Sequence, residues 1–305
     1  MKEQDPSRLF FSGNEMLAHS KREKLIYTMI VGQPVYFLTT LDEFGNDNTM
    51  VVTQFMPSAD FDPYRIAFAI RRLNITDNLR RQTYDNLRKH PEFVLSLGEN
   101  KLADAVSICG DPYIPYGISE MEVAGFTRLP SRNVAPPGIQ ECKVNIECKV
   151  DRIEDLTMLS IVVGTVVGLN LHQSVWNRID DRLAQMELID PLLEVDVVGN
   201  PPRHWLVTLN KERPIKRKLV GCKGSLHGRF DQWMKDLKQD GHITDEEEEM
   251  ILNIWKRWEN FRDPKKNVQM KQLLSSICKH IVNEDWDSLR TELNVAPSSS
   301  FHLKY

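Results

Sequence analysis

Short apolar runs separated by turn residues fill this chain up to about residue 210 and constrain its fold more than any other feature. The run PVYFLTTL is rich in β-branched and aromatic side chains, and the following DEFGND carries the glycine and polar residues of a hairpin turn. The run TMVVTQFM is predicted to be the returning strand. Further strands are expected at residues 64–70, 92–97, 144–150, 160–171 and 204–209. Because few long helical patterns separate these runs, they favour an antiparallel barrel over a parallel sheet.

Two of these runs carry more detailed predictions. VNIECKV alternates between apolar and polar residues, so Asn145, Glu147 and Lys149 are expected to face water. The later run SIVVGTVVGLNL is apolar on both faces and predicts a central strand. Within it, Gly164 and Gly168 are expected to mark bends or bulges.

The pattern becomes helical in the C-terminal part of the chain, after the basic, glycine-containing stretch PIKRKLVGCKG. In ITDEEEEMILNIWKRW, Thr244 is the predicted N-cap, Glu247 is the third helical residue, and acidic residues occupy the first turn, where the helix dipole favours them. One later helix is predicted through residues 270–281 and on past Trp286 to Leu293. Its stretch from residue 264 to 293 is faintly similar to the helical module of the steroid receptor RNA activator protein.

The organisation follows from this change of pattern. We expect an N-terminal segment at 1–24, a barrel domain at 25–214, and a helical extension at 215–305 that ends in a loose tail. Short helices are stabilised mainly by tertiary packing, so the extension must bury its apolar stripes within itself, on the barrel or on a partner. We expect the extension to dock near the functional site. We expect four tryptophans in its core: Trp233, Trp255, Trp258 and Trp286.

Composition narrows the class of protein. A net charge of -4 and a pI near 6.1 argue against a nucleic-acid-binding protein. The five cysteines are an odd number without C-x-x-C spacing, which predicts reduced thiols rather than a disulfide framework or a metal site. The chain has no apolar run long enough for a membrane span and does not start with the apolar segment of a signal peptide, so a cytoplasmic protein is expected.

The stretch RRQTYDNLRKHPEF directly follows a predicted strand and turn and raises the question of an anion site. If a helix begins at Thr83, its hydroxyl caps the first turn, and the free N–H groups there can bind a phosphate. Arg80 and Arg81 come immediately before, and Arg71 and Arg72 end the strand at 64–70. Guanidinium groups suit phosphate oxygens well. Taken alone, the pattern also fits a solvated helix start.

The order of several segments resembles a known family. The long stretch PVYFLTTLDEFGNDNTMVVTQFMPSADFDPYRIAFAI is followed by TYDNLRKHPEFVLSL, then GISEMEVAGFTRLPS and ECKVNIECKV. Over residues 25–210 this order is similar to the flavin reductase-like family of FMN-binding split β-barrels. The resemblance implies a mainly β, antiparallel split barrel with short helices, here followed by the all-α extension. It also implies a homodimer with FMN at the interface.

The resemblance further assigns residues to the cofactor. Backbone and side-chain contacts to the flavin ring are implied for four consecutive residues: Thr53, Gln54, Phe55 and Met56. The family's Thr-x-x-Asn helix start, which serves the phosphate, falls on Thr83 and Asn86, with Arg71 and Arg81 nearby. The usual serine of the ring-binding segment is absent here, and Tyr64 replaces the second proline of the usual Asp-Pro-Pro. Asp60 and Tyr84 are further candidate neighbours of the cofactor.

Hydride transfer from NADH or NADPH to the flavin is chemistry that belongs to the cofactors, so no acid–base constellation is required. His204 lies near the position where related reductases place a residue facing the nicotinamide or phosphates, although an ordinary strand-end histidine is an equal alternative. Cys109 is expected to be a buried, inert thiol, and His172 a structural or exposed residue.

Three functions stay open at this point. The first is an NAD(P)H:flavin reductase that supplies reduced flavin to another enzyme. The second is an enzyme that uses bound FMN on its own organic substrate. The third is a non-enzymatic flavin-binding protein whose helical extension recruits partners.

Overall fold

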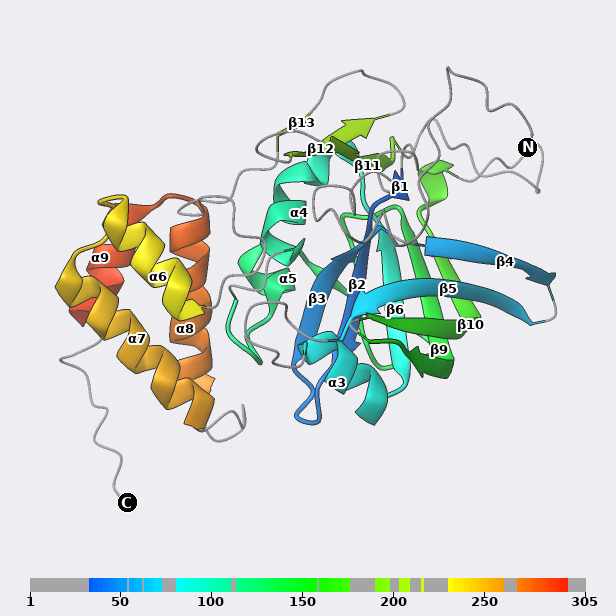
Figure 1. Ribbon diagram of the computed structural model, residues 1–305, viewed down its shortest axis with the longest axis horizontal. Coiled ribbons are helices and arrows are strands. Elements are labelled where there is room, and N and C mark those ends of the chain that lie inside the picture. Colours follow the sequence, from blue (N-terminus) through cyan, green and yellow to red (C-terminus); the bar gives the residue numbers. More distant parts are fainter. Residues whose placement is uncertain are drawn as a thin grey trace, which may run out of the picture.

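The structure of the protein, a computed structural model, contains one large curled sheet, two smaller sheets and a group of C-terminal helices (Figure 1). It describes eleven stretches of the chain: residues 33–53, 55–61, 63–72, 81–110, 114–157, 159–175, 190–197, 203–208, 215–216, 230–260 and 268–295. The predicted segment 1–24 lies outside the described residues.

Seven antiparallel strands form the large sheet: β2 (Tyr36–Leu41), β3 (Asp47–Val52), β4 (Phe55–Phe61), β5 (Tyr64–Arg71), β6 (Glu92–Leu97), β9 (Val144–Asp155) and β10 (Leu159–Leu171). Their order across the sheet is β3-β2-β6-β9-β10-β5-β4. The hairpin turn predicted between β2 and β3 is confirmed. Asp42 accepts hydrogen bonds from the backbone N–H groups of Phe44 and Asn46, and Gly45 adopts a φ of 82° that suits glycine.

The prediction of one strand over residues 49–56 is wrong. β3 pairs with β2 at one edge of the sheet, whereas β4 pairs with β5 at the other edge. Only residues 53 and 54 separate Val52 from Phe55. Because an extended chain spans at most about 3.6 Å per residue, the two edges come within about 11 Å of each other here. The sheet therefore curls into an antiparallel split barrel, which confirms the predicted fold class.

The predicted central strand is confirmed as β10, which lies between β9 and β5. Its pairing with β9 shifts register between Val163 and Gly164 and again between Val166 and Gly168, as expected for bulges at the two glycines. A Cβ atom on Gly164 would lie 2.7 Å from the ring of Phe93. Glycine is therefore needed here for packing as well as for the bulge.

The prediction of a water-facing side for β9 is wrong for two of its three residues. Asn145 and Glu147 are buried. The side-chain oxygen of Asn145 accepts from Ser96 Oγ at 2.6 Å, and the carboxylate of Glu147 accepts from the backbone N–H of Asn133 at 2.8 Å. The loop before β9 folds over this face, so polar residues there satisfy backbone groups instead of facing water. Lys149 is exposed, as predicted.

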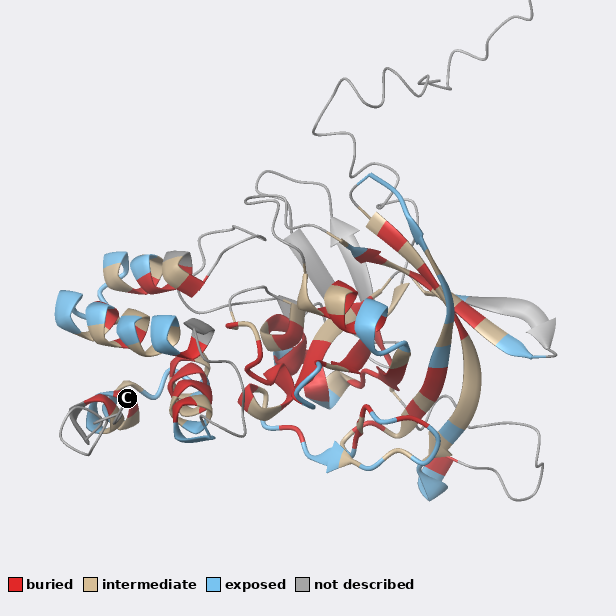
Figure 2. Ribbon diagram, turned by 90° about the horizontal axis from the view of Figure 1, so that it is seen from below, coloured by how far each residue is buried: buried red, intermediate tan, exposed pale blue. Residues whose placement is uncertain are grey.

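Two smaller sheets and short helices complete the barrel region. One sheet has the order β1-β11-β12-β13, with strands β1 (Gln33–Pro34), β11 (Leu192–Val197), β12 (Arg203–Thr208) and β13 (Ile215–Lys216). The other pairs β7 (Arg128–Leu129) with β8 (Gly138–Ile139). The helical segments are α3 (Gln82–Lys89), η1 (Asn100–Leu102), α4 (Ala103–Gly110), α5 (Glu120–Val123) and η2 (Gln173–Val175). Buried residues, red in Figure 2, gather where the large sheet meets α4 and α5.

The helical extension contains α6 (Phe230–Gln239), α7 (Asp245–Asn260), α8 (Val268–Val282) and α9 (Trp286–Val295). The predicted capping box at α7 is confirmed, because Thr244 Oγ1 accepts from Glu247 N at 3.2 Å and Thr244 N donates to Glu247 Oε2 at 2.7 Å. The helix predicted through residues 270–281 is confirmed as α8, but its continuation past Trp286 is a separate helix. Glu284 adopts a φ of 56°, and Asp285 then caps α9 by accepting from Ser288 N at 3.2 Å.

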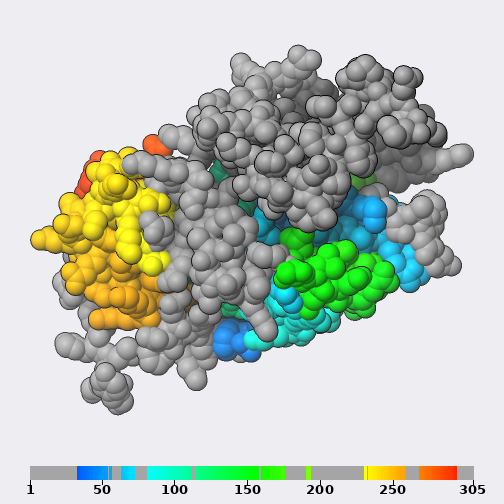
Figure 3. Space-filling view, viewed as in Figure 1, coloured from blue at the N-terminus to red at the C-terminus, as the bar shows by residue number. Residues whose placement is uncertain are grey.

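The extension packs on the barrel as well as within itself. Its buried core includes Trp233 and Trp258 and continues into Ile118 and Val123, which belong to the region of α5. In Figure 3 the yellow and orange atoms of α6 and α7 form one end of the molecule, away from the green atoms of β9 and β10. Among the described helices, none combines the length and apolar character needed to cross a bilayer.

Candidate functional site

The predicted ring-binding segment lies in the connection that joins the two edge strands of the large sheet, β3 and β4. Thr53 is half-buried in the connection between β3 and β4, and Phe55 and Met56 begin β4. The ring of Phe55 packs at 4.7 Å from that of Tyr36, whereas Met56 is 65% exposed. Gln54 lies outside the described residues. This end of β4 therefore offers an exposed apolar side chain on an edge strand of the sheet.

The predicted helix start is displaced. α3 begins at Gln82 with Arg81 as its N-cap, so the prediction that Thr83 caps the helix is wrong. The reason is that Arg81 N donates to Arg72 O at 3.1 Å, while the Thr83 hydroxyl donates to Asn48 Oδ1 at 2.6 Å. The first turn nevertheless keeps the N–H groups that have no acceptor inside a helix. It therefore stays a candidate anion site, with Arg81 at its start.

The other predicted phosphate residues have separate positions. Asn86 is buried, and its amide donates to Thr40 Oγ1 at 3.0 Å, which ties α3 to β2. Arg71 is exposed at the end of β5. Arg72 donates to Thr157 O at 2.9 Å, so its guanidinium holds the turn between β9 and β10. Arg80 lies outside the described residues.

Tyr84 belongs to a second polar cluster, with Arg88 and Asp155. Its hydroxyl donates to Asp155 Oδ2 at 2.9 Å, and Arg88 Nη2 lies 2.6 Å from the same oxygen. Hydrogen bonds from Ser160, Tyr84 and Arg88 hold the pKa of Asp155 below its usual range. This cluster anchors α3 to the end of β9. The side chain of Asp60 lies outside the described residues.

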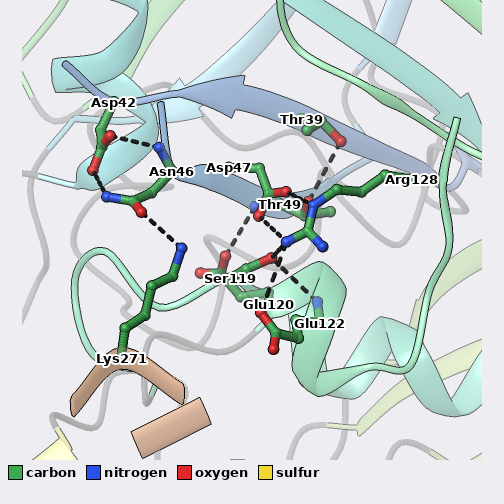
Figure 4. A network of polar contacts seen from close by, with 10 residues as sticks. All are labelled: Thr39, Asp42, Asn46, Asp47, Thr49, Ser119, Glu120, Glu122, Arg128 and Lys271. Atoms are coloured by element: carbon green, nitrogen blue, oxygen red, sulfur yellow. Dashed lines mark hydrogen bonds and ion pairs between the residues drawn. The ribbon is translucent and has the colours of Figure 1, made fainter. Parts of the chain in front are cut away.

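A buried polar network joins β3 to α5, and Figure 4 shows its members Asp47, Thr49 and Glu120. Glu120 accepts from Asn48 Nδ2 with both carboxylate oxygens, at 2.8 and 2.9 Å, and from Thr49 N at 2.9 Å. Burial is the largest cause that raises the pKa of Glu120, to about 8, although these donors oppose it. Nearby, Asp47 is buried and pairs with Arg128. Through Asn48, this network determines where the Thr83 hydroxyl points.

Sequence reasoning missed Asn48 and Glu120. A signal for Glu120 was present, because Ser119 caps a short helix by accepting from Glu122 N at 3.1 Å, which is half of a capping-box pattern. That pattern predicts a helix but not the burial of Glu120. For Asn48 the local pattern gave no signal, because Asp47, Asn48 and Thr49 are consecutive polar residues and all three are buried.

The remaining candidates belong to other elements than α3. His204 lies in β12 opposite Asp196, in the smaller four-stranded sheet, and its side chain is outside the described part. Cys109 is buried in the core around α4. His172 is exposed, as expected, with Nδ1 at 2.8 Å from Ser174 Oγ.

The described thiols are buried, and none forms a disulfide. Burial raises the pKa of the thiols of Cys142, Cys148 and Cys278, which disfavours the reactive thiolate. Cys222 lies outside the described residues. Those same described ranges contain no cluster of His, Cys, Asp and Glu side chains arranged to hold a metal ion.

Comparison with known families identifies the barrel. The family model for the flavin reductase like domain matches residues 28–183, just over half of the chain. The chain belongs to this family. The match covers the split barrel through β10 and ends before β11, so the helical extension lies outside it.

Individual relatives agree with this assignment. An uncharacterised protein of Methanothermobacter thermautotrophicus is 29% identical over 187 residues, which cover 59% of this chain and 80% of the relative. Among solved structures, nitrilotriacetate monooxygenase component B from Bacillus cereus matches with a TM-score of 0.58 at 20% identity, over 69% of this chain and all of the other. The 2-nitrobenzoate 2-nitroreductase of Pseudomonas fluorescens matches with a TM-score of 0.54 at 21% identity, over 66% and 93% of the two chains. At these identities the structures show a shared fold.

The first turn of α3 has one further feature that bears on an anion site. Gln82 Nε2 is buried and has no hydrogen-bond partner, although Gln82 Oε1 accepts from Gly117 N at 3.0 Å. A buried donor without an acceptor costs about 1–3 kcal/mol, so an anion that accepts from it would be stabilised there. The helix dipole favours the same negative charge.

Proposed function

We propose that the chain is an FMN-binding oxidoreductase, most simply an NAD(P)H-dependent flavin reductase. The observation that carries this proposal is the family match. The start of α3 as a candidate anion site and residues 53–56 as a candidate ring site support it. Asn48 lies in β3 and accepts a hydrogen bond from Thr83, and Thr53 directly follows the same strand. The five residues from Asn48 to Thr53 span about 17 Å at 3.3 Å per residue. This separation suits an elongated ligand with a phosphate at one end and a ring at the other.

In this proposal the residues of the chain bind and orient the cofactor. Arg81 and the first turn of α3 hold the phosphate, and Thr53 and Gln54 offer hydrogen bonds to the polar edge of the ring. Phe55 and Met56 supply apolar contact and exclude water from one ring face. A bound flavin supplies the hydride chemistry, with NADH or NADPH as the co-substrate. The protein itself needs no general acid or base for this step.

The phosphate assignment is tested by two flavins that differ only at that group. Arg81→Ala is expected to weaken FMN binding by about 1.5–3 kcal/mol, the usual value of a hydrogen bond to a charged group, and to leave riboflavin nearly unchanged. Arg257→Ala, an exposed arginine on α7, is the matched control. If Arg81→Ala weakens the binding of FMN and of riboflavin equally, Arg81 does not contact the phosphate.

The type of reaction is tested by steady-state oxidation of NADH and NADPH with and without added free FMN. A flavin reductase that supplies reduced flavin turns over only when free FMN or another acceptor is present. Turnover with an organic acceptor and bound FMN alone would instead favour an enzyme acting on its own substrate. Flavin binding with no nicotinamide oxidation at all would favour the non-enzymatic alternative.

We further propose that two chains associate through the outer face of the large sheet, with FMN at the interface, in the cytoplasm and without nucleic acid or membrane. The support is an apolar face on β5 and β10, where Ala69 pairs with Ile161 and Ala67 pairs with Val163. Phe68, between the two alanines, points to the other face of the sheet and is buried. Sedimentation velocity measures the association state. A monomer at micromolar concentration that still binds FMN contradicts the shared-interface site.

A further inference from the structure

Besides its apolar packing on the region of α5, the helical extension makes two hydrogen bonds to segments that connect to α3. One is the loop of residues 114–119 before α5, and the other is the hairpin between β2 and β3. Figure 1 shows α4 and α5 between the extension and the large sheet, with α8 facing them. The loop at 114–119 is joined to the first turn of α3 by a hydrogen bond between Gly117 and Gln82. The hairpin is joined to it through β3, where Asn48 accepts from Thr83.

The first contact is made by Trp258 of α7. Its side chain is fully buried, and its Nε1 donates to Tyr116 O at 2.8 Å. The ring lies directly against Gly117, where a Cβ atom would come within 3.1 Å of Trp258 Cζ2. Gly117 has a φ of 82°, a conformation that favours glycine. Trp258 therefore fixes both the position and the conformation of the backbone at 116–117.

The same backbone holds the start of α3. Gly117 N donates to Gln82 Oε1 at 3.0 Å, and Gln82 is the first residue of the helix. Because the Gln82 amide is held at its oxygen, its nitrogen has a defined direction. That nitrogen is the buried donor without a hydrogen-bond partner at the proposed phosphate site.

The second contact is made by Lys271 of α8. Figure 4 shows Lys271 extending from the helix to the hairpin, where its Nζ lies 2.7 Å from Asn46 Oδ1. Asn46 is held in turn by Asp42, which accepts from Asn46 Nδ2 at 2.8 Å. Two residues along β3, the side chain of Asn48 accepts from the Thr83 hydroxyl. The hairpin that Lys271 fastens therefore carries the residue that orients Thr83.

We propose that the helical extension holds the first turn of α3 in its binding conformation, with Trp258 and Lys271 as positioning residues that set the affinity for the flavin phosphate. The inference rests on the proposed function, because it takes this turn as the phosphate site. It assigns the extension a role in cofactor binding without any contact between the extension and the cofactor. When either contact is lost, the first turn of α3 fluctuates more in the free protein. Binding of the phosphate then has to order this turn, which lowers the affinity for FMN.

The test measures the dissociation constants of FMN and riboflavin with the full-length chain. Trp258→Phe keeps a buried ring but removes the donor to Tyr116, and we expect it to weaken FMN roughly three- to tenfold, as for loss of one hydrogen bond. Riboflavin, which has no phosphate, is expected to change less than about twofold. Lys271→Met should weaken FMN in the same selective way, and Lys271→Arg should restore it. The matched control is Trp286→Phe, since this tryptophan stacks on His242 inside the extension.

A second measurement follows α3 itself without any flavin. Amide hydrogen exchange of a peptide covering residues 81–89 is expected to accelerate by about tenfold in Trp258→Phe and not in Trp286→Phe. Suppose that the wild-type chain prefers FMN over riboflavin, but neither variant changes that preference or the hydrogen exchange of α3. The proposed role of the extension is then refuted, and the proposed function stands. If the wild-type chain shows no preference for FMN, the phosphate site at α3 is wrong and both proposals fall.

Discussion

Replacing Glu120 with glutamine is expected to remove a pH dependence of stability that this buried carboxyl creates. An unfolded glutamate titrates near its ordinary pKa of 4.5, whereas burial raises the pKa of Glu120 in the folded chain to about 8. Because the folded-state pKa is the higher one, the stabilising contribution is fully present below about pH 4.5 and is lost as the pH rises through about 8. The ionised form has to be buried beside Asp47, which is unfavourable.

The magnitude follows from the titration of one proton. Between the two pKa values, the free energy of unfolding of the wild-type chain should fall by about 1.4 kcal/mol for each pH unit. From about pH 5 to about pH 8 this amounts to about 4 kcal/mol, a value of the same order as the total stability of many domains. Glutamine at this position keeps an acceptor for Thr49 N but sets an amide against the amide of Asn48. The variant therefore carries its own loss of stability, which does not depend on pH.

The assay is urea unfolding, followed by tryptophan fluorescence, at several pH values between about 5 and about 8. The informative quantity is the difference in unfolding free energy between the wild-type chain and Glu120→Gln as a function of pH. Glu122→Gln is the matched control, since Glu122 lies on the same helix with its side chain 43% exposed. A difference that stays constant over this range would refute the reasoning. It would mean that Glu120 is ionised throughout, because the donors from Asn48 and Thr49 outweigh burial.

Three further substitutions test particular features. Gly164→Ala places a Cβ atom 2.7 Å from the ring of Phe93, so it should lower stability by about 1–3 kcal/mol in thermal unfolding; an unchanged midpoint would show that Phe93 can move aside. Thr244→Ala removes the cap of α7 and should cost about 1 kcal/mol, and a loss below about 0.3 kcal/mol would mean that Glu247 caps the helix alone. Ala69→Arg places a charge on the outer face of β5 and should convert the proposed dimer to monomers in sedimentation velocity. A dimer that persists in this variant would place the interface elsewhere.

The candidate site was predicted only in part, and the reason is physical. The segment at residue 53 and the helix start near residue 82 follow from local patterns and a family resemblance, and their roles at the cofactor stay predictions. Thr83 shows the limit of such patterns. A threonine at a helix start is most simply an N-cap, but here its hydroxyl bonds to Asn48, which is 35 positions earlier in the chain. Local preference gives way when a tertiary partner offers a better acceptor.

What the sequence determined by itself depends on interactions between near neighbours. Short apolar runs bounded by turn residues predict β5 and β6, turn chemistry predicts the hairpin at Gly45, and two glycines predict the bulges of β10. The capping box at Thr244 needs only residues three positions apart. Each of these features satisfies its own hydrogen bonds or dihedral preferences within a few residues, so the pattern remains visible in the sequence.

Tertiary structure alone decided the features that join distant segments. The run at 49–56 became two strands because closure of the barrel gives β3 and β4 different partners. Glu147 was buried because a loop folds over it and supplies backbone donors. The contact of Trp258 with Tyr116 joins residues 142 positions apart. Such contacts form only when the burial of apolar surface offsets the entropy of closing long loops, and no short window of sequence records that balance.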